Sequence, residues 1–175
     1  KEIAYLLSKK YKKISPIDLK IPSPKETGKS FNANSKLKAN FFSKFVDYPV
    51  ISDDSGLCIK SLGNQPGIYS SRLAKKKGSF YKAMKFILKK LKKKKNRSAS
   101  FYCSLSYKFP KKKIVTVIGK LDGAISEKIK GKKGFGYDPI FIPKNKNQTF
   151  GEMMPSKKYK IDHRYNAFKK IKKFL

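Results

Sequence analysis

Ten residues of strict alternation, at positions 98–107, constrain the fold of this chain more than any other stretch. Serines and Tyr102 alternate there with apolar residues, which are Ala99, Phe101, Cys103, Leu105 and Tyr107. Alternation with a period of two is typical of a half-buried β-strand. A turn at residues 110–113 and an apolar run at 114–118 follow, which predicts an antiparallel partner strand. We therefore expect the centre of the sheet to be mixed rather than purely parallel.

Stretches with apolar residues at helical spacing occur in the sequence both before and after these two expected strands, which indicates an α/β fold. In one such stretch Leu37, Phe41 and Phe45 recur every four positions and are expected to face the core. Helices are expected at residues 1–11, 31–45 and 79–91, with Ser79 capping the third, and a final helix is expected to start at His163 with Asp162 as its N-cap. Shorter extended segments are expected at residues 14–19, 57–62 and 140–142.

The length and composition of the chain exclude several classes of protein. With 175 residues and 39% hydrophobic composition, the chain fits one domain with a real core. Cys58 and Cys103 are too far apart in sequence to indicate a disulfide framework or a zinc site, which favours a reducing, cytoplasmic compartment. No apolar run approaches the length of a membrane span, so no membrane partner is expected.

Positive charge dominates the chain, with 44 Lys and Arg against 11 Asp and Glu and a formal net charge of +33. Only Arg72, Arg97 and Arg164 are arginines, and the lysines are spread along the whole chain. Proteins that read bases rely on arginine forks, so this diffuse lysine excess does not by itself indicate specific nucleic-acid binding. It does predict non-specific attraction of polyanions at low salt.

Two adjacent acids, Asp53 and Asp54, end a short apolar run in a chain where acids are scarce. Ligands of α/β proteins gather at the carboxyl ends of strands, and neighbouring residues of extended chain point to opposite sides. We expect Asp54 to face a metal ion or water in a site, while Asp53 is held by the backbone or by a lysine. The alternative is an ordinary strand-end turn, in which Asp53 and Ser55 bond their own backbone.

Three further stretches carry candidate residues, each with a structural alternative. Lys38 is either a solvated helix lysine or a cation facing phosphate, and it lies four residues after Asn34. Glycines at 131–136 would let the backbone approach a flat ligand, with Phe135 as a stacking face. His163 lies at the expected start of the last helix, where a histidine is more often structural than functional.

Taken together, these stretches resemble the inosine triphosphate pyrophosphatases, which clear non-standard purine nucleotides. The resemblance is carried by SDDSGL at 52–57, GIYSSR at 67–72, GFGYDPIF at 134–141 and HR at 163–164. It implies an elongated α/β fold with a long central mixed sheet, flanking helices and two lobes around a substrate cleft. It also implies a homodimer that uses Mg²⁺ to hydrolyse ITP, dITP or XTP to the monophosphate and pyrophosphate.

The resemblance assigns roles residue by residue. Asp54 would be the general base and, with Glu26, a magnesium ligand. The implied substrate contacts are Lys38 at the phosphates, Ser55, the base-stacking Phe135, the pocket residues Gly136, Tyr137 and Asp138, Lys158 near the nucleotide, and His163 with Arg164 at the 6-oxo edge of the purine.

The chain also departs from the family pattern. The family opens with a strand and a T/S-x-N-x-x-K turn, and this sequence starts just after that turn, so residues 1–175 are expected to form a single domain that lacks both. Asp162 stands where the family commonly has serine, and Ala33 where it often has glutamate. A lysine-rich nucleic-acid-binding protein, or an inactive relative with the same fold, remains the alternative reading.

Overall fold

The computed structural model describes residues 2–7, 9, 11–110 and 112–175. These residues divide into two compact units along the chain. Unit 1 comprises Lys1–Asp54, Cys103–Gly119 and His163–Leu175, and unit 2 comprises Ser55–Tyr102 and Lys120–Asp162. Each unit has its own cluster of buried apolar side chains.

The strands form one five-stranded sheet in the order β2-β1-β3-β4-β5. Their bounds are β1 Val50–Ile59, β2 Gln65–Pro66, β3 Ser98–Lys108, β4 Val115–Ile125 and β5 Phe141–Pro143. In the described part of the chain this sheet is antiparallel, as the β1–β2 and β4–β5 pairings are, so the expectation of a mixed sheet is wrong. The reason lies between β1 and β3, where two successive helices return the chain to the end at which β1 finished, whereas a single crossover helix would give a parallel neighbour.

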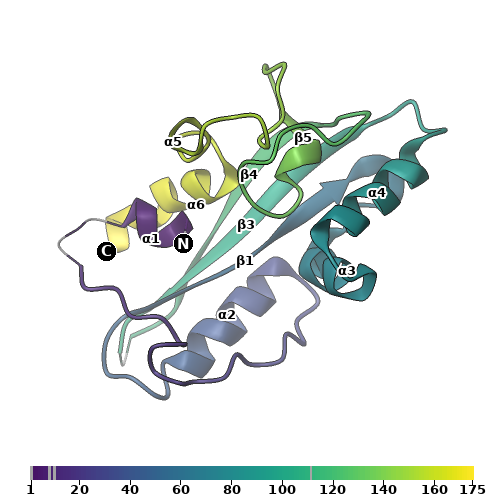
Figure 1. The fold of residues 1–175 in the computed structure, drawn as a ribbon. Helices are drawn as coiled ribbons and strands as arrows, with labels where there is room; N and C mark the ends of the chain where they lie inside the picture. The colour runs from purple at the N-terminus through teal and green to yellow at the C-terminus, as the bar shows by residue number, and fades with distance from the viewer. Residues whose placement is uncertain (1, 8, 10, 111) are drawn as a thin grey trace. The chain divides into compact units, whose positions relative to one another are not determined.

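Unit 1 contains the helices α1 Glu2–Leu6, α2 Phe31–Phe42 and α6 His163–Ile171, followed by the short helix Lys172–Phe174. Figure 1 shows α1 alongside α6 although they come from opposite ends of the chain. Buried side chains of β3 and α6 form the core, among them Leu105 and Phe168, and Ile3 and Leu6 of α1 pack against it. The helix expected over residues 1–11 is thus much shorter, and positions 1, 8 and 10 lie outside the described residues.

Helix α2 meets strand β3 through hydroxyl groups. Oγ of Ser35 lies 2.8 Å from Oγ of Ser104 and 2.8 Å from Oγ of Ser106, and Oγ of Ser106 lies 2.8 Å from the hydroxyl of Thr116 on β4. The buried residues of the helix are Asn34, Ser35 and Ala39. The expectation that Leu37, Phe41 and Phe45 face the core is therefore wrong. Leu37 and Phe41 are half-buried, and Phe45 lies beyond the helix end and is exposed.

Unit 2 contains α3 Ser70–Lys77, α4 Phe80–Leu91 and α5 Pro155–Lys158, with short 3-10 helices at Lys60–Leu62, Gly67–Tyr69 and Asp138–Ile140. Helices α3 and α4 lie side by side (Figure 1). The predicted cap of α4 is confirmed, because Oγ of Ser79 accepts the N–H of Lys82 at 3.1 Å. The apolar face of α4 enters a core that also contains Phe101, Phe141 and Phe150.

The structure corrects three interpretations of short segments. Strand β1 runs without interruption through the acidic pair to Ile59, so Asp53 and Asp54 do not form a strand-end turn, and the extended segment expected at 57–62 ends in a helical turn. Residues 16–20 form a turn rather than extended chain, because the carboxylate of Asp18 accepts bonds from the N–H and the hydroxyl of Ser15, both 2.8 Å long. Among the described residues, no helix is long and apolar enough to cross a membrane.

Candidate active site

In unit 1, two carboxylates converge on the ammonium group of Lys38. Its Nζ lies 2.8 Å from Oε1 of Glu26 and 3.4 Å from Oδ1 of Asp54. The other carboxylate oxygen of Asp54 accepts a bond of 3.1 Å from the side-chain amide of Asn34. We call Glu26, Asn34, Lys38 and Asp54 the carboxylate cluster. It brings together all three residues that the sequence assigned to the phosphate and metal side of the site.

The elements that hold the carboxylate cluster are fixed by local bonds. Helix α2 begins after Ser30, whose Oγ accepts the N–H of Ala33 at 3.1 Å. One turn into the helix, Oδ1 of Asn34 accepts the N–H of Gly28 at 2.8 Å, which ties the segment that carries Glu26 to the helix that carries Lys38. Asn34 therefore orients both carboxylate-bearing segments. Sequence reasoning did not assign it to the site, although its position four residues before Lys38 was a usable signal.

Burial and charge act in opposite directions on this cluster. Desolvation by burial raises the pKa of Asp54 above its usual value, and the charge of Lys38 and the bond from Asn34 offset only part of that rise. Burial alone would lower the pKa of Lys38, but its bond to Glu26 and the negative charges of Asp54, Glu26 and Asp53 outweigh burial and raise it. Lys38 therefore stays positively charged, while Asp54 is a carboxylate with an increased affinity for protons. That property suits a group that takes up a proton.

Asp53 points to different partners, as expected for the neighbour of Asp54 on a strand. Its Oδ2 lies 3.4 Å from Nε of Arg164. Nη1 of Arg164 lies 2.7 Å from Oε2 of Glu2 and 3.1 Å from Nε2 of His163. The two residues predicted to read the base therefore lie together at the start of α6, with Arg164 held between two acids. Glu2 was missed at the sequence level, since an acid in the first turn of a short helix gave no signal of a distant partner.

In unit 2 the loop of residues 131–137, which we call the glycine-rich loop, folds around the carboxylate of Asp138. Oδ2 of Asp138 accepts the N–H of Phe135 at 2.6 Å and the ammonium of Lys158 at 2.7 Å. Gly134 adopts a positive φ of 79° next to this carboxylate, and a Cβ there would overlap Oδ2. A side chain at position 134 would thus be strained in conformation and would also collide with Asp138.

Lys158 and Asp138 form a sealed ion pair, with each side chain 2% exposed. Lys158 also lies 5.5 Å from the ring centroid of Phe150. The sequence placed Lys158 near the nucleotide, and the structure places its ammonium on the carboxylate that shapes the loop. Asp138 thus orders the loop that carries Phe135, and its expected role in shaping the pocket for the base stays a prediction.

Phe135 is the exposed member of an aromatic row. The residue is 64% exposed, and its ring packs edge-on against Phe80 with centroids 5.0 Å apart. Phe80 also packs edge-on against the buried ring of Tyr137, at 5.3 Å. Gly136 lies between the two loop aromatics with a positive φ of 67°. The loop therefore offers one aromatic face to a ligand and buries the other.

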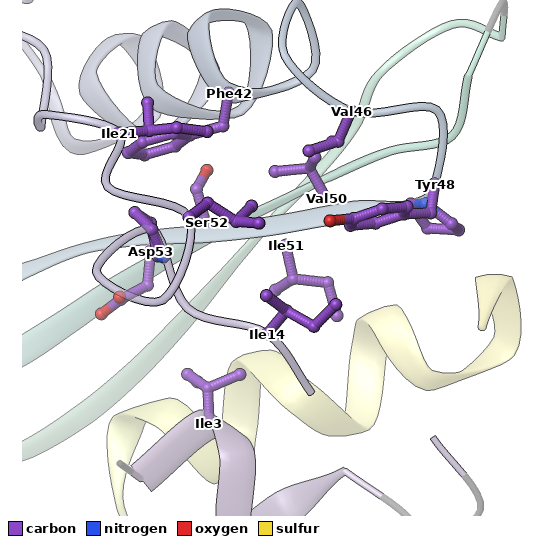
Figure 2. Close-up of a pocket in the computed structure, with 13 residues that line it drawn as sticks. Ile3, Ile14, Ile21, Phe42, Val46, Tyr48, Val50, Ile51, Ser52 and Asp53 are labelled. Atoms are coloured by element: carbon purple, nitrogen blue, oxygen red, sulfur yellow. The ribbon is translucent and has the colours of Figure 1, made fainter. Parts of the chain in front are cut away.

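An apolar cavity of about 290 Å³ lies within unit 1 (Figure 2). Apolar side chains from α1, α2, β1 and the intervening loops line most of it, among them Ile3, Ile14, Ile21, Phe42, Tyr48 and Ile51. Figure 2 shows Asp53 at one end of the cavity, and neither Glu26 nor Lys38 is among its lining residues. The cavity offers little polar chemistry, so we take the carboxylate cluster as the candidate site of unit 1 and, separately, the glycine-rich loop as the candidate ligand contact of unit 2.

Comparisons with known proteins agree with these motifs. A dITP/XTP pyrophosphatase of Bacillus licheniformis is 42% identical over 156 residues, which cover 88% of this chain and 80% of the relative. A dITP/XTP pyrophosphatase of Caulobacter vibrioides is 38% identical over 176 residues, which cover 99% of this chain and 91% of the relative.

A solved structure and a family model extend the comparison. The structure of the Staphylococcus aureus Ham1 protein matches with a TM-score of 0.85 and 34% identity, covering 91% of this chain and 83% of that one. A model of the Ham1 family matches residues 1–174. With a family match over almost the whole length and relatives this similar, the chain belongs to the Ham1 family.

Proposed function

We propose that this protein hydrolyses non-standard purine nucleoside triphosphates, ITP, dITP and XTP, to the nucleoside monophosphate and pyrophosphate. The observation that carries the proposal is the carboxylate cluster, in which the Lys38 ammonium lies between Asp54 and Glu26. A cation flanked by two acids, in a chain whose relatives are named dITP/XTP pyrophosphatases, fits phosphate-anhydride chemistry.

Asp54 is the proposed general base. Its carboxylate would take a proton from a water molecule while the water oxygen bonds to the α-phosphorus. The bond from that phosphorus to the bridging oxygen then breaks, and pyrophosphate leaves with the bonding electrons. Lys38 would stabilise the negative charge that gathers on the phosphate oxygens, and Asn34 holds the Asp54 carboxylate in place through its amide.

Glu26 and Asp54 are the proposed ligands for Mg²⁺. The donor set fits this ion, because Mg²⁺ takes oxygen ligands and is commonly held by one or two carboxylates with substrate phosphates and water completing the shell. Among the described residues, no group of three or more His, Cys, Asp or Glu side chains could hold a metal ion. When bound, the ion would neutralise phosphate charge and orient the leaving group.

The proposed base contacts are assigned unit by unit. In unit 2, Phe135 offers the exposed aromatic face for stacking, while Gly136, Tyr137 and Asp138 set the conformation of its loop and Ser55 contacts the substrate. In unit 1, His163 and Arg164 would donate to the 6-oxygen of hypoxanthine or xanthine. Lys158 would act through Asp138 rather than on the nucleotide directly, because its ammonium is bonded to that carboxylate.

The test is phosphate release from ITP and XTP with Mg²⁺, measured with and without added inorganic pyrophosphatase. Signal only in the presence of the added enzyme is expected, since the first product is pyrophosphate. Orthophosphate without it, or no release from either nucleotide, would overturn the proposal. ATP serves as the comparison nucleotide, because its 6-amino group would face the donors of Arg164 and lower kcat/KM by at least about tenfold.

A homodimer in the cytoplasm is part of the same proposal, and light scattering measures the assembly directly. Non-specific binding of polyanions is expected from the net charge of +33 and should weaken steeply as salt is added. The nucleic-acid-binding alternative is not favoured, because the relatives carry the names of pyrophosphatases.

A further inference from the structure

Ser70 in unit 2 lies at the centre of three hydrogen bonds. Its Oγ accepts the N–H of Leu57 at 2.9 Å and donates to the carbonyl of Gly67 at 2.7 Å. Its own carbonyl accepts the hydroxyl of Tyr137 at 2.8 Å. Ser70 is buried at the first position of α3. Strand β1 and the 3-10 helix before α3 therefore meet the glycine-rich loop, which is distant in sequence, at one serine.

At the β1 end of this network the backbones touch directly. A Cβ at Gly56 would overlap the carbonyl oxygen of Gly67 and lie 2.6 Å from Oγ of Ser70. No side chain separates the strand from the turn at this point, and the residue that precedes Gly56 is Ser55. The Leu57–Ser70 bond therefore fixes the strand just after a proposed substrate contact.

At the loop end the network holds the aromatic row. Tyr137 is buried, and burial raises the pKa of its hydroxyl, which therefore stays protonated. The protonated hydroxyl donates a hydrogen bond to the Ser70 carbonyl. The ring of Tyr137 packs edge-on against Phe80, and Phe80 packs edge-on against Phe135. Fixing the hydroxyl of Tyr137 therefore restrains the row that ends at the exposed ring of Phe135.

We infer that Ser70 is a positioning residue, which holds the loop carrying Phe135 at a set distance from strand β1 beside Ser55. The inference rests on the proposed function, in which Phe135 stacks on the base and Ser55 contacts the substrate. Ser70 acts through Tyr137 and Leu57. Loosening this link should weaken binding of the purine part of a ligand, while the phosphate groups bound by the carboxylate cluster are unaffected.

The experiment compares the affinities of two partial ligands, inosine monophosphate and inorganic pyrophosphate, by isothermal titration calorimetry with Mg²⁺. Tyr137→Phe removes one hydrogen bond and should raise the Kd of inosine monophosphate by about three- to tenfold. Ser70→Ala removes two bonds and should raise it further. The Kd of pyrophosphate should stay within about twofold in both variants.

Two neighbouring variants serve as matched controls. Tyr69→Phe removes a hydroxyl from an exposed tyrosine and keeps the ring that Arg72 covers, and Ser71→Ala removes one from an exposed serine. Both should bind the two ligands as wild type does. If Ser70→Ala does not fold, Tyr137→Phe carries the test, because it removes a single oxygen atom.

Equal weakening of both ligands in Tyr137→Phe would show that Ser70 has only a structural role and would overturn the inference. Unchanged affinity for inosine monophosphate would also overturn it. Failure of the proposed function looks different, because in that case wild type itself would neither release pyrophosphate from ITP nor bind inosine monophosphate.

Discussion

Lys38 in unit 1 and Lys158 in unit 2 each form an ion pair with a carboxylate, and the two ion pairs differ in how far they are buried. In unit 1 the Lys38 side chain is 17% exposed and contacts two acids, Glu26 at 30% and Asp54 at 8% exposure. In unit 2 Lys158 and Asp138 are each 2% exposed, and the same carboxylate oxygen also bonds to the backbone of the loop. The first arrangement is open to solvent and ligands, and the second is closed to both.

This difference in burial indicates a ligand-binding role for one lysine and a structural role for the other. A partly exposed lysine with two acids can exchange one partner for a phosphate oxygen or a metal-bound group at small cost, because water and ligand can replace what it loses. A sealed pair cannot exchange partners, because removing one charge leaves the other buried without compensation. Lys38 is thus suited to touch substrate, and Lys158 to hold the loop.

The largest expected effect is on stability. Lys158→Met should lower the free energy of unfolding by about 3 to 5 kcal/mol, because it leaves the Asp138 carboxylate buried without its ammonium. Urea denaturation followed by circular dichroism measures this loss. The control is Lys120→Met, which removes an exposed pair with Asp122 and should cost about 1 kcal/mol or less. Equal losses for the two variants would show that burial does not make the Lys158–Asp138 pair costlier to break than the exposed pair.

The next effect is on turnover. Asp54→Asn keeps the size of the side chain but removes its charge and its basicity, so kcat for ITP should fall by about 10² or more. Asp47→Asn, at an exposed loop position, should leave kcat unchanged. Activity of Asp54→Asn close to that of wild type would remove the open cluster from the chemistry.

Arg164 provides a third, intermediate arrangement, with a side chain 17% exposed and held by Glu2 and Asp53. If it reads the 6-oxygen, Arg164→Ala should lower the ratio of kcat/KM for ITP to that for ATP by about tenfold, because one charged donor to the base is lost. Arg72→Ala changes an exposed arginine and should keep the ratio. An unchanged ratio in Arg164→Ala would make Arg164 a purely structural partner of its two acids.

The smallest effect is a displacement of the pH profile. The positive charge of Lys38 lowers the pKa of Asp54, which burial has raised, so Lys38→Met should raise that pKa further. A general base works when deprotonated, and the acidic limb of kcat/KM should therefore move to higher pH. The height of the profile will also fall, so only the position of the limb decides. Lys36→Met on the exposed side of the same helix should not move the limb, and a limb that stays in place in Lys38→Met would uncouple Lys38 from Asp54.

The sequence predicted those helices and strands that depend on the spacing of neighbouring residues. Helix α4 and its Ser79 cap followed from apolar spacing and one hydroxyl. Strand β3 followed from alternation, but the expectation that it is half-buried is wrong, because its serines at 100, 104 and 106 are buried too. The approach of Glu26, Lys38 and Asp54 was anticipated only through the family resemblance, because spacing left Lys38 undecided between solvent and phosphate. Whether Asp54 is the metal ligand and base stays a prediction.

Failures arose where distant partners decide the outcome. The sequence of α2 offers Leu37, Phe41 and Phe45 as a core face, but β3 presents serines there, so Ser35 faces inward instead. Nothing near Asp53 predicts that β1 continues, because its continuation depends on pairing with neighbouring strands. Lys158 looks like any other lysine in a chain with so many, and only the folded loop shows that its charge is buried.

The serine contacts beneath α2 also bear on temperature. Hydrophobic packing near room temperature is largely entropic and weakens on cooling. The contact between α2 and β3 is made by the hydroxyls of Ser35, Ser104 and Ser106, whose directional bonds do not depend on that entropy. The helix that carries Lys38 is therefore held in register by bonds that keep their strength in the cold, and the geometry around Asp54 should survive chilling that loosens the apolar cores.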